Sequence, residues 1–368
     1  MLLIVFYCFV AVTAINIIYY LSFFGFLFSK PKSHLLEKIE EPVSVIICAK
    51  NEAENLQHNL PKILQQNYAD YEVILINDAS WDNTLDVMED FQLKDSKVVL
   101  VNVQSNERFW GNKKYALTLG IKKAKYQKLL FTDADCYPTS ENWLAEMAQG
   151  FQPKKSIVLG YGAYETYKKS FLNKIVRYET LLTALHYFSS AKRGNAYMGV
   201  GRNLAYTSDE FYENKGFVSH MSIPSGDDDL FINQVATKNN TSIVFTEDSF
   251  TYSKPKTTWK SWFAQKRRHV STAKFYKKKH QLKLGLFYLS QLSFWCLFFL
   301  LIIIFDWKYV LGIFLLRTLF LYLTYAKATK IFKEKNLLWL LPFQDLTLVL
   351  SQISIFIYNS ISKPTHWK

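Results

Sequence analysis

Apolar residues are concentrated near the two ends of the chain, with an alternating pattern between them. The first apolar block, Leu2 to Phe28, is almost uninterrupted and rich in Ile, Phe and Tyr. Because about 20 apolar residues suffice to cross a bilayer as a helix, this block predicts a transmembrane helix over residues 1–29. It has neither a basic start nor a small-residue cleavage site, which argues against a secretory signal peptide.

Three more apolar segments lie near the C-terminus, at about 284–305, 309–325 and 337–361. They predict two or three transmembrane helices within residues 284–361. Pro342, Gln344 and Asp345 interrupt the last segment, so it spans the membrane, re-enters it or lies along its surface. Arg317, inside the second segment, would cost about 3 kcal/mol if it faced lipid. We therefore expect Arg317 to face the bundle interior or to snorkel to the interface.

Between Pro42 and about Ser253, short apolar runs alternate with amphipathic stretches. The runs predict strands at 43–48, 71–76, 98–103 and 128–131, and the stretches predict helices at about 54–65, 82–91 and 113–124. This alternation indicates βαβ units and therefore a mostly parallel sheet flanked by helices. The predicted fold class is α/β, with one domain over residues 42–253 and transmembrane helices outside it.

The distribution of charge along the chain indicates which kind of binding partner the basic residues would contact. The formal net charge is +13, and much of the excess lies in residues 254–283, just before the C-terminal apolar segments. This position favours an anionic membrane surface over nucleic acid and predicts a basic amphipathic region at the interface. Lys30 and Lys32 follow the first apolar block, which places the α/β domain on the cytoplasmic side of a bacterial-type inner membrane.

Two acidic residues follow one of the predicted strands. Asp133 and Asp135 come directly after the apolar run 129–131. Residues two apart in an extended chain point the same way, so both carboxylates face one spot beyond the strand end. Two hard oxygen anions suit Mg²⁺ or Mn²⁺, which in turn clamps a nucleotide diphosphate. The competing interpretation is an Asx turn at the strand end.

Polar residues at three more strand ends extend this predicted pocket. Lys50 and Glu52 follow the first strand, Asp78 follows the second, and Lys113 opens the helix after the third. A carboxylate can accept from a base or a ribose, and a lysine can meet phosphate. A helix cap or a turn explains any one of these residues, but it explains the whole ordered set less well.

In these motifs the sequence resembles the family 2 inverting glycosyltransferases of the GT-A fold. The match covers about residues 43–271 and rests on VSVIICAKNEAENL (43–56), INDASWDNT (76–84), Lys113-x-x-Ala116-Leu117, TDAD (132–135), GRNLAY (201–206), SGDDDL (225–230) and QKRRH (265–269). The resemblance implies that Glu52 and Asp78 contact the nucleoside and that Lys113 lines the same pocket. It also implies that Asp135 holds a divalent metal on the donor diphosphate, with Asp133 near the ribose or the metal.

The SGDDDL motif resembles the family's Glu-Asp motif for the catalytic base, with Gly226 where the Glu would stand. Alignment on Leu230 makes Asp227 the base, whereas alignment on Gly226 as a family glycine makes it Asp228. We prefer Asp227. The reaction needs a carboxylate that is ionised at neutral pH and within reach of the acceptor hydroxyl. The alternative is that the acidic run caps the next helix, a task that one Asp can fulfil.

Two motifs supply candidates for binding the acceptor or a phosphate: Gln265, Arg267, Arg268, Arg202 and Asn203. QKRRH resembles the family's Gln-x-x-Arg-Trp motif, with His269 in place of the Trp, which puts processive synthesis in doubt. The arginines suit a diphosphate or a lipid phosphate. Alternatively, QKRRH is part of a basic helix on the membrane surface, and Asn203 is a turn residue.

The sequence therefore predicts a membrane-anchored inverting glycosyltransferase. It would move a sugar from a nucleotide-diphosphate donor, with UDP favoured, to a lipid-linked or membrane-proximal acceptor by metal-assisted displacement with an Asp base. One alternative is a processive polysaccharide synthase, although a translocating channel needs more helices than the C-terminal segments provide. Another is a non-catalytic nucleotide-sugar-binding membrane subunit, against which the retained acidic residues argue.

Overall fold

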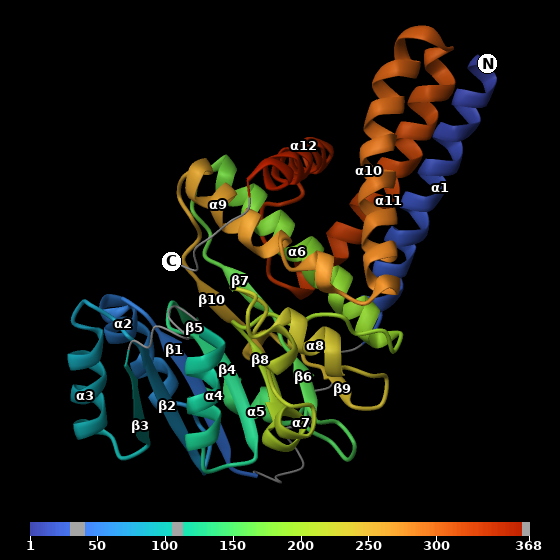
Figure 1. Cartoon of the computed structure of the whole chain (residues 1–368). Coiled ribbons are helices and arrows are strands. Elements are labelled where there is room, and N and C mark those ends of the chain that lie inside the picture. The colour runs from blue at the N-terminus through green and yellow to red at the C-terminus, as the bar shows by residue number, and fades with distance from the viewer. Residues whose placement is uncertain (30–40, 105–112, 363–368) are drawn as a thin grey trace.

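The protein consists of an α/β domain joined to a group of long helices (Figure 1). The computed structural model describes residues 1–29, 41–104 and 113–362. Lys30 and Lys32, on which the predicted orientation rests, lie outside the described residues.

A seven-stranded sheet in the order β3-β2-β1-β4-β8-β6-β9 forms the centre of the α/β domain. Its strands are β1 (Val43–Ala49), β2 (Tyr71–Asp78), β3 (Val98–Val103), β4 (Lys128–Asp133), β6 (Ile157–Leu159), β8 (Leu204–Thr207) and β9 (Thr241–Ile243). Only β8 runs antiparallel to its neighbours, β4 and β6. The predicted mostly parallel sheet is confirmed.

Helices cover both faces of this sheet, which explains why its strands are almost continuously apolar. They are α2 (Ala53–Leu64), α3 (Thr84–Lys94), α4 (Lys113–Lys123), α5 (Trp143–Ala148), α6 (Phe171–Lys192), α7 (Ser208–Glu213) and α8 (Asp229–Val235). Val45 on β1 packs with α2, α3 and α5 in one buried cluster, and the next residue, Ile46, packs with α4, α6 and α8 in another.

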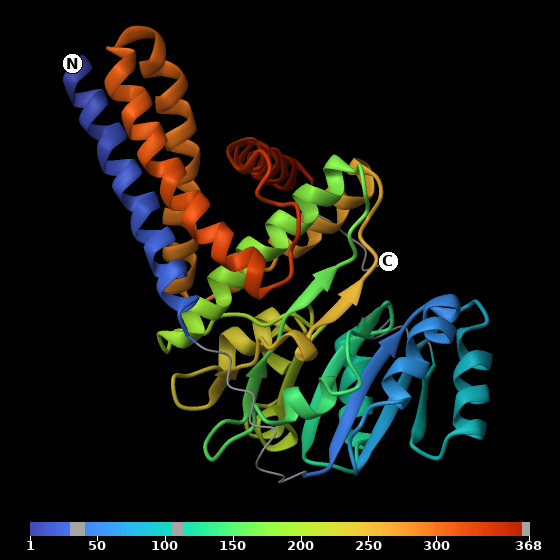
Figure 2. The ribbon, with the colours of Figure 1, turned by 180° about the vertical axis from the view of Figure 1, so that it is seen from behind.

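A second, three-stranded sheet lies between the main sheet and the long helices (Figure 2). It consists of β5 (Cys136–Pro138), β10 (Thr251–Ser253) and β7 (Gly162–Tyr164), with β10 in the middle. Strand β5 begins directly after the Asp133–Asp135 segment, so this sheet fixes the exit of the acidic turn.

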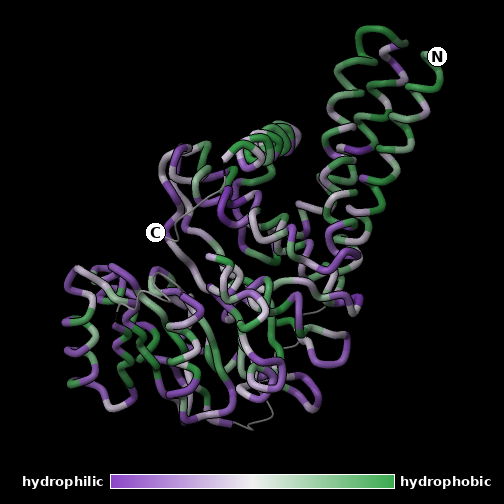
Figure 3. Tube along the Cα trace, in the orientation of Figure 1, coloured by the Kyte–Doolittle hydropathy of each residue, from purple (hydrophilic) through white to green (hydrophobic). Residues whose placement is uncertain are grey.

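Within the described residues, four helices are long and apolar enough to cross a membrane: α1 (Leu2–Phe26), α10 (Lys278–Ile304), α11 (Trp307–Ile331) and α12 (Leu341–Ile361). Helices α1, α10 and α11 run side by side, and Figure 3 shows that most of their residues are hydrophobic. Helix α12 takes a different direction, because it is seen nearly end-on in both Figure 1 and Figure 2 while the other three run lengthwise. The interrupted last segment is therefore one helix that crosses the direction of the bundle.

The basic region 254–283 is not one continuous element. It contains helix α9 (Trp259–Val270), a short 3₁₀ turn at Ala273–Phe275 and the first residues of α10. The predicted amphipathic stretch is thus interrupted before the chain enters the bundle. Trp262 is buried on α9, whereas Trp259 is 46% exposed.

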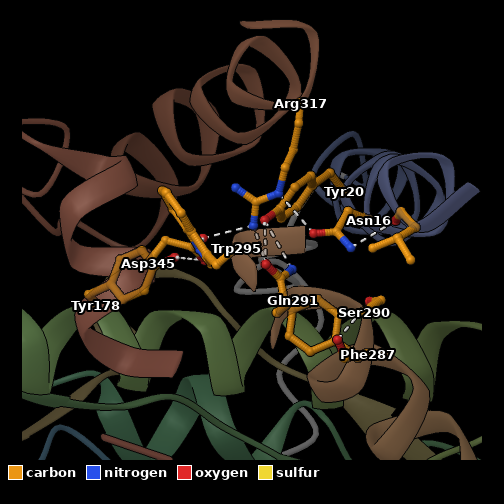
Figure 4. A network of polar contacts seen from close by, with 10 residues as sticks. Asn16, Tyr20, Tyr178, Phe287, Ser290, Gln291, Trp295, Arg317 and Asp345 are labelled. Atoms are coloured by element: carbon orange, nitrogen blue, oxygen red, sulfur yellow. Dashed lines mark hydrogen bonds and ion pairs between the residues drawn. The ribbon is translucent and has the colours of Figure 1, made fainter. Parts of the chain in front are cut away.

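A buried polar network joins the bundle to α12 and to the α/β domain (Figure 4). Arg317 is fully buried, as expected for a cation that faces the bundle interior, and its Nη2 lies 2.7 Å from Oδ2 of Asp345 on α12. Asp345 also accepts hydrogen bonds from Trp295 Nε1 on α10 at 2.9 Å and from the Tyr178 hydroxyl on α6 at 3.2 Å. Arg317 Nε donates to Asn16 Oδ1 on α1 at 2.8 Å. One ion pair thus fixes the start of α12 against three other helices and α6.

Removal of one partner of this pair should be costly. We expect Arg317→Leu to lower the free energy of unfolding by about 3 kcal/mol, because Asp345 would stay buried without its cation. The double variant Arg317→Met with Asp345→Asn should recover more than half of that loss, because it buries no unpaired charge. Thermal unfolding of the detergent-solubilised protein measures both, and a single variant as stable as wild type would contradict the expectation.

Candidate active site

The carboxyl ends of β1, β2 and β4 meet at one edge of the sheet. In the parallel ladders Ala49 pairs with Asn77, and Cys48 pairs with Asp133. Asp78 is the last residue of β2 and lies two residues beyond Ile76, which is at the level at which Asp133 ends β4. Such an edge is where open α/β sheets bind ligands.

Asp78 has a carboxylate that lacks a full set of partners. The residue is 6% exposed, and its Oδ2 is buried without a hydrogen-bond partner among the described residues. Burial raises the pKa of Asp78, and the positive charges of Lys50 and Lys113 lower it in part. Glu52 lies on the adjacent loop, where its Oε2 accepts a hydrogen bond from Asn55 Nδ2 at 2.6 Å. The pocket thus offers a buried acceptor that suits a donor group of a ligand.

The loops after β1 and β2 are held in strained conformations and are bonded to each other. Asn51 and Ala79 have φ values of 56° and 50°, in the left-handed region that non-glycine residues seldom adopt. The Asn51 N–H donates to Ser80 Oγ at 3.0 Å, and Asn51 Oδ1 accepts from the Trp81 N–H at 3.0 Å. Backbone strain that is held by hydrogen bonds between loops is typical of ligand-binding loops.

Lys113 links two of the candidate carboxylates. Its Nζ lies 2.8 Å from Asp133 Oδ1 and 3.0 Å from Asp227 Oδ2, and the residue is 9% exposed. Burial alone would lower the pKa of Lys113, but the charges of Asp133 and Asp227 raise it well above its ordinary value. Burial likewise opposes ionisation of Asp227, but Lys113 holds the pKa of Asp227 below its usual range. Asp227 is therefore an ionised carboxylate at neutral pH.

The three consecutive aspartates have three different environments. Asp227 forms the ion pair with Lys113 just described. Asp228 instead accepts two backbone hydrogen bonds: its Oδ2 accepts from the Gly201 N–H at 2.7 Å, and its Oδ1 accepts from the Asp229 N–H at the start of α8. Asp229 Oδ2 accepts from the Tyr276 hydroxyl at 2.6 Å and so ties α8 to the segment before α10. Burial and the charges of Asp227 and Asp229 raise the pKa of Asp228 to about 7. Helix capping accounts for Asp228 but not for Asp227.

Gly226 departs from the resembled motif for a structural reason. Its φ is +102°, which favours glycine, and a Cβ at this position would lie 2.4 Å from Leu230 Cδ1. A Glu at position 226 would clash and strain the backbone in this conformation. The turn is further held by Lys114, whose Nζ donates to the carbonyl oxygens of Ile223 and Ser225 at 2.5 and 2.7 Å. Sequence reasoning missed Lys114, although a second lysine at the buried start of a helix was a visible signal.

The acidic pair after β4 offers oxygen ligands for a cation. Ligand atoms of Asp133, Asp135 and Cys136 lie within 4.8 Å of one another. Burial raises the pKa of the Cys136 thiol well above its usual range, so it stays protonated and is a poor ligand for a hard cation. Burial, and then the charges of Asp133 and Glu52, raise the pKa of Asp135. A divalent cation would relieve this repulsion, so the two carboxylates fit Mg²⁺ or Mn²⁺.

Comparison with known families identifies the class of enzyme. The model of Glycosyl transferase family 2 matches residues 44–205, and that of Glycosyl transferase family group 2 matches residues 129–333, more than half of the chain. The chain belongs to the family 2 glycosyltransferases.

Relatives of this glycosyltransferase match only part of its length. A poly-beta-1,6-N-acetyl-D-glucosamine synthase of Staphylococcus epidermidis is 35% identical over 118 residues, which are 31% of this chain and 27% of that protein. Glycosyltransferase GlyG of Streptococcus pneumoniae is 30% identical over 132 residues, which are 36% of this chain and 42% of that protein. The matched part thus spans less than half of the length of either relative.

A solved structure matches the whole chain. The mannosyltransferase PcManGT from Pyrobaculum calidifontis, in complex with GDP-Man and Mn²⁺, is similar with a TM-score of 0.66 and 16% identity, covering 99% of this chain and 100% of that chain. At this identity the likeness concerns the fold alone, and it confirms the predicted GT-A fold.

The GRNLAY motif of the glycosyltransferase lies beside the acidic pair, but its two candidate residues differ. Arg202 Nη1 donates to the Ala163 carbonyl oxygen at 3.0 Å, and its guanidinium lies 4.2 Å from the centre of the Tyr164 ring. Burial would lower the pKa of Arg202, but Tyr164 and the acidic cluster around Asp135 raise it. Asn203 is fully buried, and its Nδ2 donates to the carbonyl oxygen of Tyr161 at 3.0 Å. In this structure Asn203 faces the core rather than an acceptor.

The two arginines of the QKRRH motif have different surroundings, one near the acidic site and one against helix α12. Gln265 is half-buried on α9. Burial lowers the pKa of Arg268, and the negative charges of Asp227 and Asp133 offset this in part, so Arg268 lies near the acidic groups of the site. Arg267 instead donates from Nε to Asn359 Oδ1 on α12 at 2.9 Å. Its guanidinium therefore binds α12, and in this structure Arg268 is the better placed of the two arginines to meet a phosphate.

Proposed function

We propose that this glycosyltransferase moves a sugar, with inversion, from a nucleotide-diphosphate donor to an acceptor at the membrane surface. The observation that carries the proposal is that Lys113 bridges Asp133, beside the candidate metal ligand, and Asp227, the candidate base, within 3.0 Å. An ionised carboxylate thus lies next to a site for a metal-bound diphosphate, as inverting displacement requires.

The donor end of the site supports a nucleotide sugar. Asp78 keeps a buried oxygen without a partner among the described residues, which suits an N–H of a nucleobase, and Glu52 lies on the neighbouring loop for the nucleoside. The N3–H of uracil meets this need, so UDP is the first nucleotide to test. Asp135 and Asp133 would hold Mg²⁺ or Mn²⁺, which when bound neutralises charge that develops on the leaving diphosphate.

In the reaction, Asp227 accepts the proton of the acceptor hydroxyl. The acceptor oxygen forms a bond to the anomeric carbon as the bond from that carbon to the diphosphate oxygen breaks. The nucleoside diphosphate leaves; before the proton transfer, Lys113 holds Asp227 ionised and oriented. Arg268, which lies near Asp227 and Asp133, supplies positive charge for the diphosphate or for an acceptor phosphate.

The long helices support a position of this site beside a membrane. Helices α1, α10 and α11 would span it, and α9 with α12 would lie along its surface, because α12 crosses the direction of the other three. Lys278 and Lys330 lie at the ends of α10 and α11 that are nearest the α/β domain, which supports a cytoplasmic domain over residues 42–253. A lipid or lipid-linked acceptor fits this position.

A polysaccharide synthase is a second candidate, because the relatives from Staphylococcus carry that name. The bundle favours transfer to a single membrane-proximal acceptor. Its interior is filled by side chains such as Phe9, Phe294 and Val310, each fully buried, so these three helices enclose packed side chains where a translocated polymer would need a path.

A panel of nucleotide sugars tests the proposal. Purified protein with Mn²⁺ should bind one uridine diphosphate sugar in preference to guanosine and adenosine analogues and transfer its sugar to a lipid extract. Asp78→Asn should weaken binding of that donor about tenfold, because a buried acceptor is replaced by a group that also carries donors. Calorimetry measures binding, and release of the nucleoside diphosphate measures transfer. Equal binding of all nucleotides would contradict the preference for uridine diphosphate. Products that carry many sugars would favour the polysaccharide synthase.

A further inference from the structure

Two cationic side chains meet at the junction of the bundle and the α/β domain, and neither has an acidic partner in the described part of the chain. Lys283 on α10 donates from Nζ to Ser190 Oγ on α6 at 2.8 Å. Arg193, the residue that ends α6, donates from Nη1 to Ser22 Oγ on α1. Among the described residues, no ion pair joins either cation to a carboxylate. The junction of α1, α6 and α10 is therefore positively charged.

The neighbouring histidine does not add to this charge or offset it. His186 lies one turn before Ser190 on α6, and its ring packs on Phe23 and Phe287 at centroid distances of 4.7 and 4.3 Å. Burial and, to a smaller extent, the positive charges of Lys283 and Arg193 lower the pKa of His186 to about 3. His186 is thus neutral, and both cations lie near it.

The surroundings of this pair are amphipathic. Figures 1 and 2 agree that α1, α6 and α10 meet at the domain-facing end of the bundle, and Figure 3 shows the change there from an apolar bundle surface to polar residues. Leu282, next to Lys283, is 73% exposed, and Leu21, next to Ser22, is 48% exposed. An exposed leucine thus directly precedes, in the sequence, both the cationic Lys283 and the hydroxyl-bearing Ser22.

We propose that Arg193 and Lys283 bind the phosphate of an anionic phospholipid at this junction. Basic pockets between transmembrane helices on the cytoplasmic side suit such headgroups. The guanidinium offers paired N–H donors, the ammonium offers a point charge, and the half-buried Ser22 hydroxyl can turn to donate as well, whereas the fully buried Ser190 only positions Lys283. The adjacent exposed leucines favour a ligand with acyl chains over free phosphate. The inference rests on the membrane placement proposed above and is independent of the transfer reaction.

Lipid binding by the full-length protein tests this site. Native mass spectrometry of the detergent-solubilised protein compares phosphatidylglycerol, phosphatidylcholine and inorganic phosphate. Wild type should prefer phosphatidylglycerol. Arg193→Gln with Lys283→Gln should weaken its binding about thirtyfold, and each single variant about fivefold, since a cation near the surface contributes about 1 kcal/mol. Arg193→Lys with Lys283→Arg should retain most of the preference.

A matched control removes the same charge elsewhere. Lys122→Gln with Lys123→Gln neutralises two exposed lysines of α4 in the α/β domain and should bind lipid like wild type. Wild-type phosphatidylglycerol binding by the glutamine pair would overturn the site. So would inorganic phosphate that binds as tightly as the lipid, because the ligand would then be a free anion. A transfer-deficient Asp227→Asn variant should still bind the lipid, so failure of the proposed reaction and failure of this site are distinguishable.

Discussion

Asp227→Asn is expected to reduce sugar transfer about a thousandfold while nucleotide binding stays near wild type. Within the run Asp227–Asp229, it is Asp227 that forms an ion pair with Lys113, and this cation keeps the pKa of Asp227 below its usual range. An amide in its place cannot accept the acceptor proton. Lys113 retains Asp133 as a partner in the variant, so the fold should persist. Release of nucleoside diphosphate measures transfer, and calorimetry measures donor binding.

Two further variants decide whether Asp227 is the base. Asp228→Asn should keep most of the transfer, because Asp228 accepts the Gly201 N–H and its pKa is raised to about 7, so a neutral group is tolerated there. Glu213→Gln removes an exposed carboxylate of α7 and should leave transfer unchanged. If Asp228→Asn alone loses transfer while Asp227→Asn retains it, the base is Asp228.

The buried strands were predictable because both of their faces are covered. The run 98–103 was predicted with the bounds that β3 has, because five of its six residues are apolar, although this edge strand is only partly buried. Strand β4 continues two residues beyond the predicted end at Phe131, because its ladder with β1 extends to the pair Cys48 and Asp133. Strands β6, β8 and β9 were not predicted, because three or four residues carry no readable periodicity.

The direction of α12 and the division of the QKRRH motif depend on contacts between distant segments. Asp345 interrupts an apolar segment in the sequence, yet in the fold it is the partner of Arg317. That pair fixes the start of α12, and Arg267 then binds Asn359 near its end. Local sequence shows the charges but not which of them meet. For the same reason Asn203, which looked like a site residue, lies in the core, where it also accepts from Trp143 Nε1 at 3.1 Å.

Asp135→Asn should abolish both the sugar transfer that Mn²⁺ supports and the stabilisation of the fold by Mn²⁺. Asp135 and Asp133 are the oxygen ligands that the acidic turn offers, so loss of one should reduce metal-supported transfer about a thousandfold, which corresponds to several kcal/mol of transition-state stabilisation. Wild type should gain about 3 kcal/mol of stability when Mn²⁺ is present at a hundred times its dissociation constant, and the variant should gain none. Thermal unfolding with and without Mn²⁺ gives the stability change, and nucleoside diphosphate release gives the rate.

The stability change caused by Asp135→Asn in the absence of metal distinguishes a metal ligand from a carboxylate with a structural role. Burial, and then Asp133 and Glu52, raise the pKa of Asp135, so its ionised form destabilises the fold once the pH exceeds the ordinary value of about 4. At neutral pH, Asp135→Asn should therefore be at least as stable as wild type without metal and less stable with it. Glu141→Gln, at an exposed position on the following loop, should behave like wild type under both conditions. A carboxylate with only a structural role would show no such reversal, and Mn²⁺-dependent transfer by Asp135→Asn at the wild-type rate would contradict its role as a metal ligand.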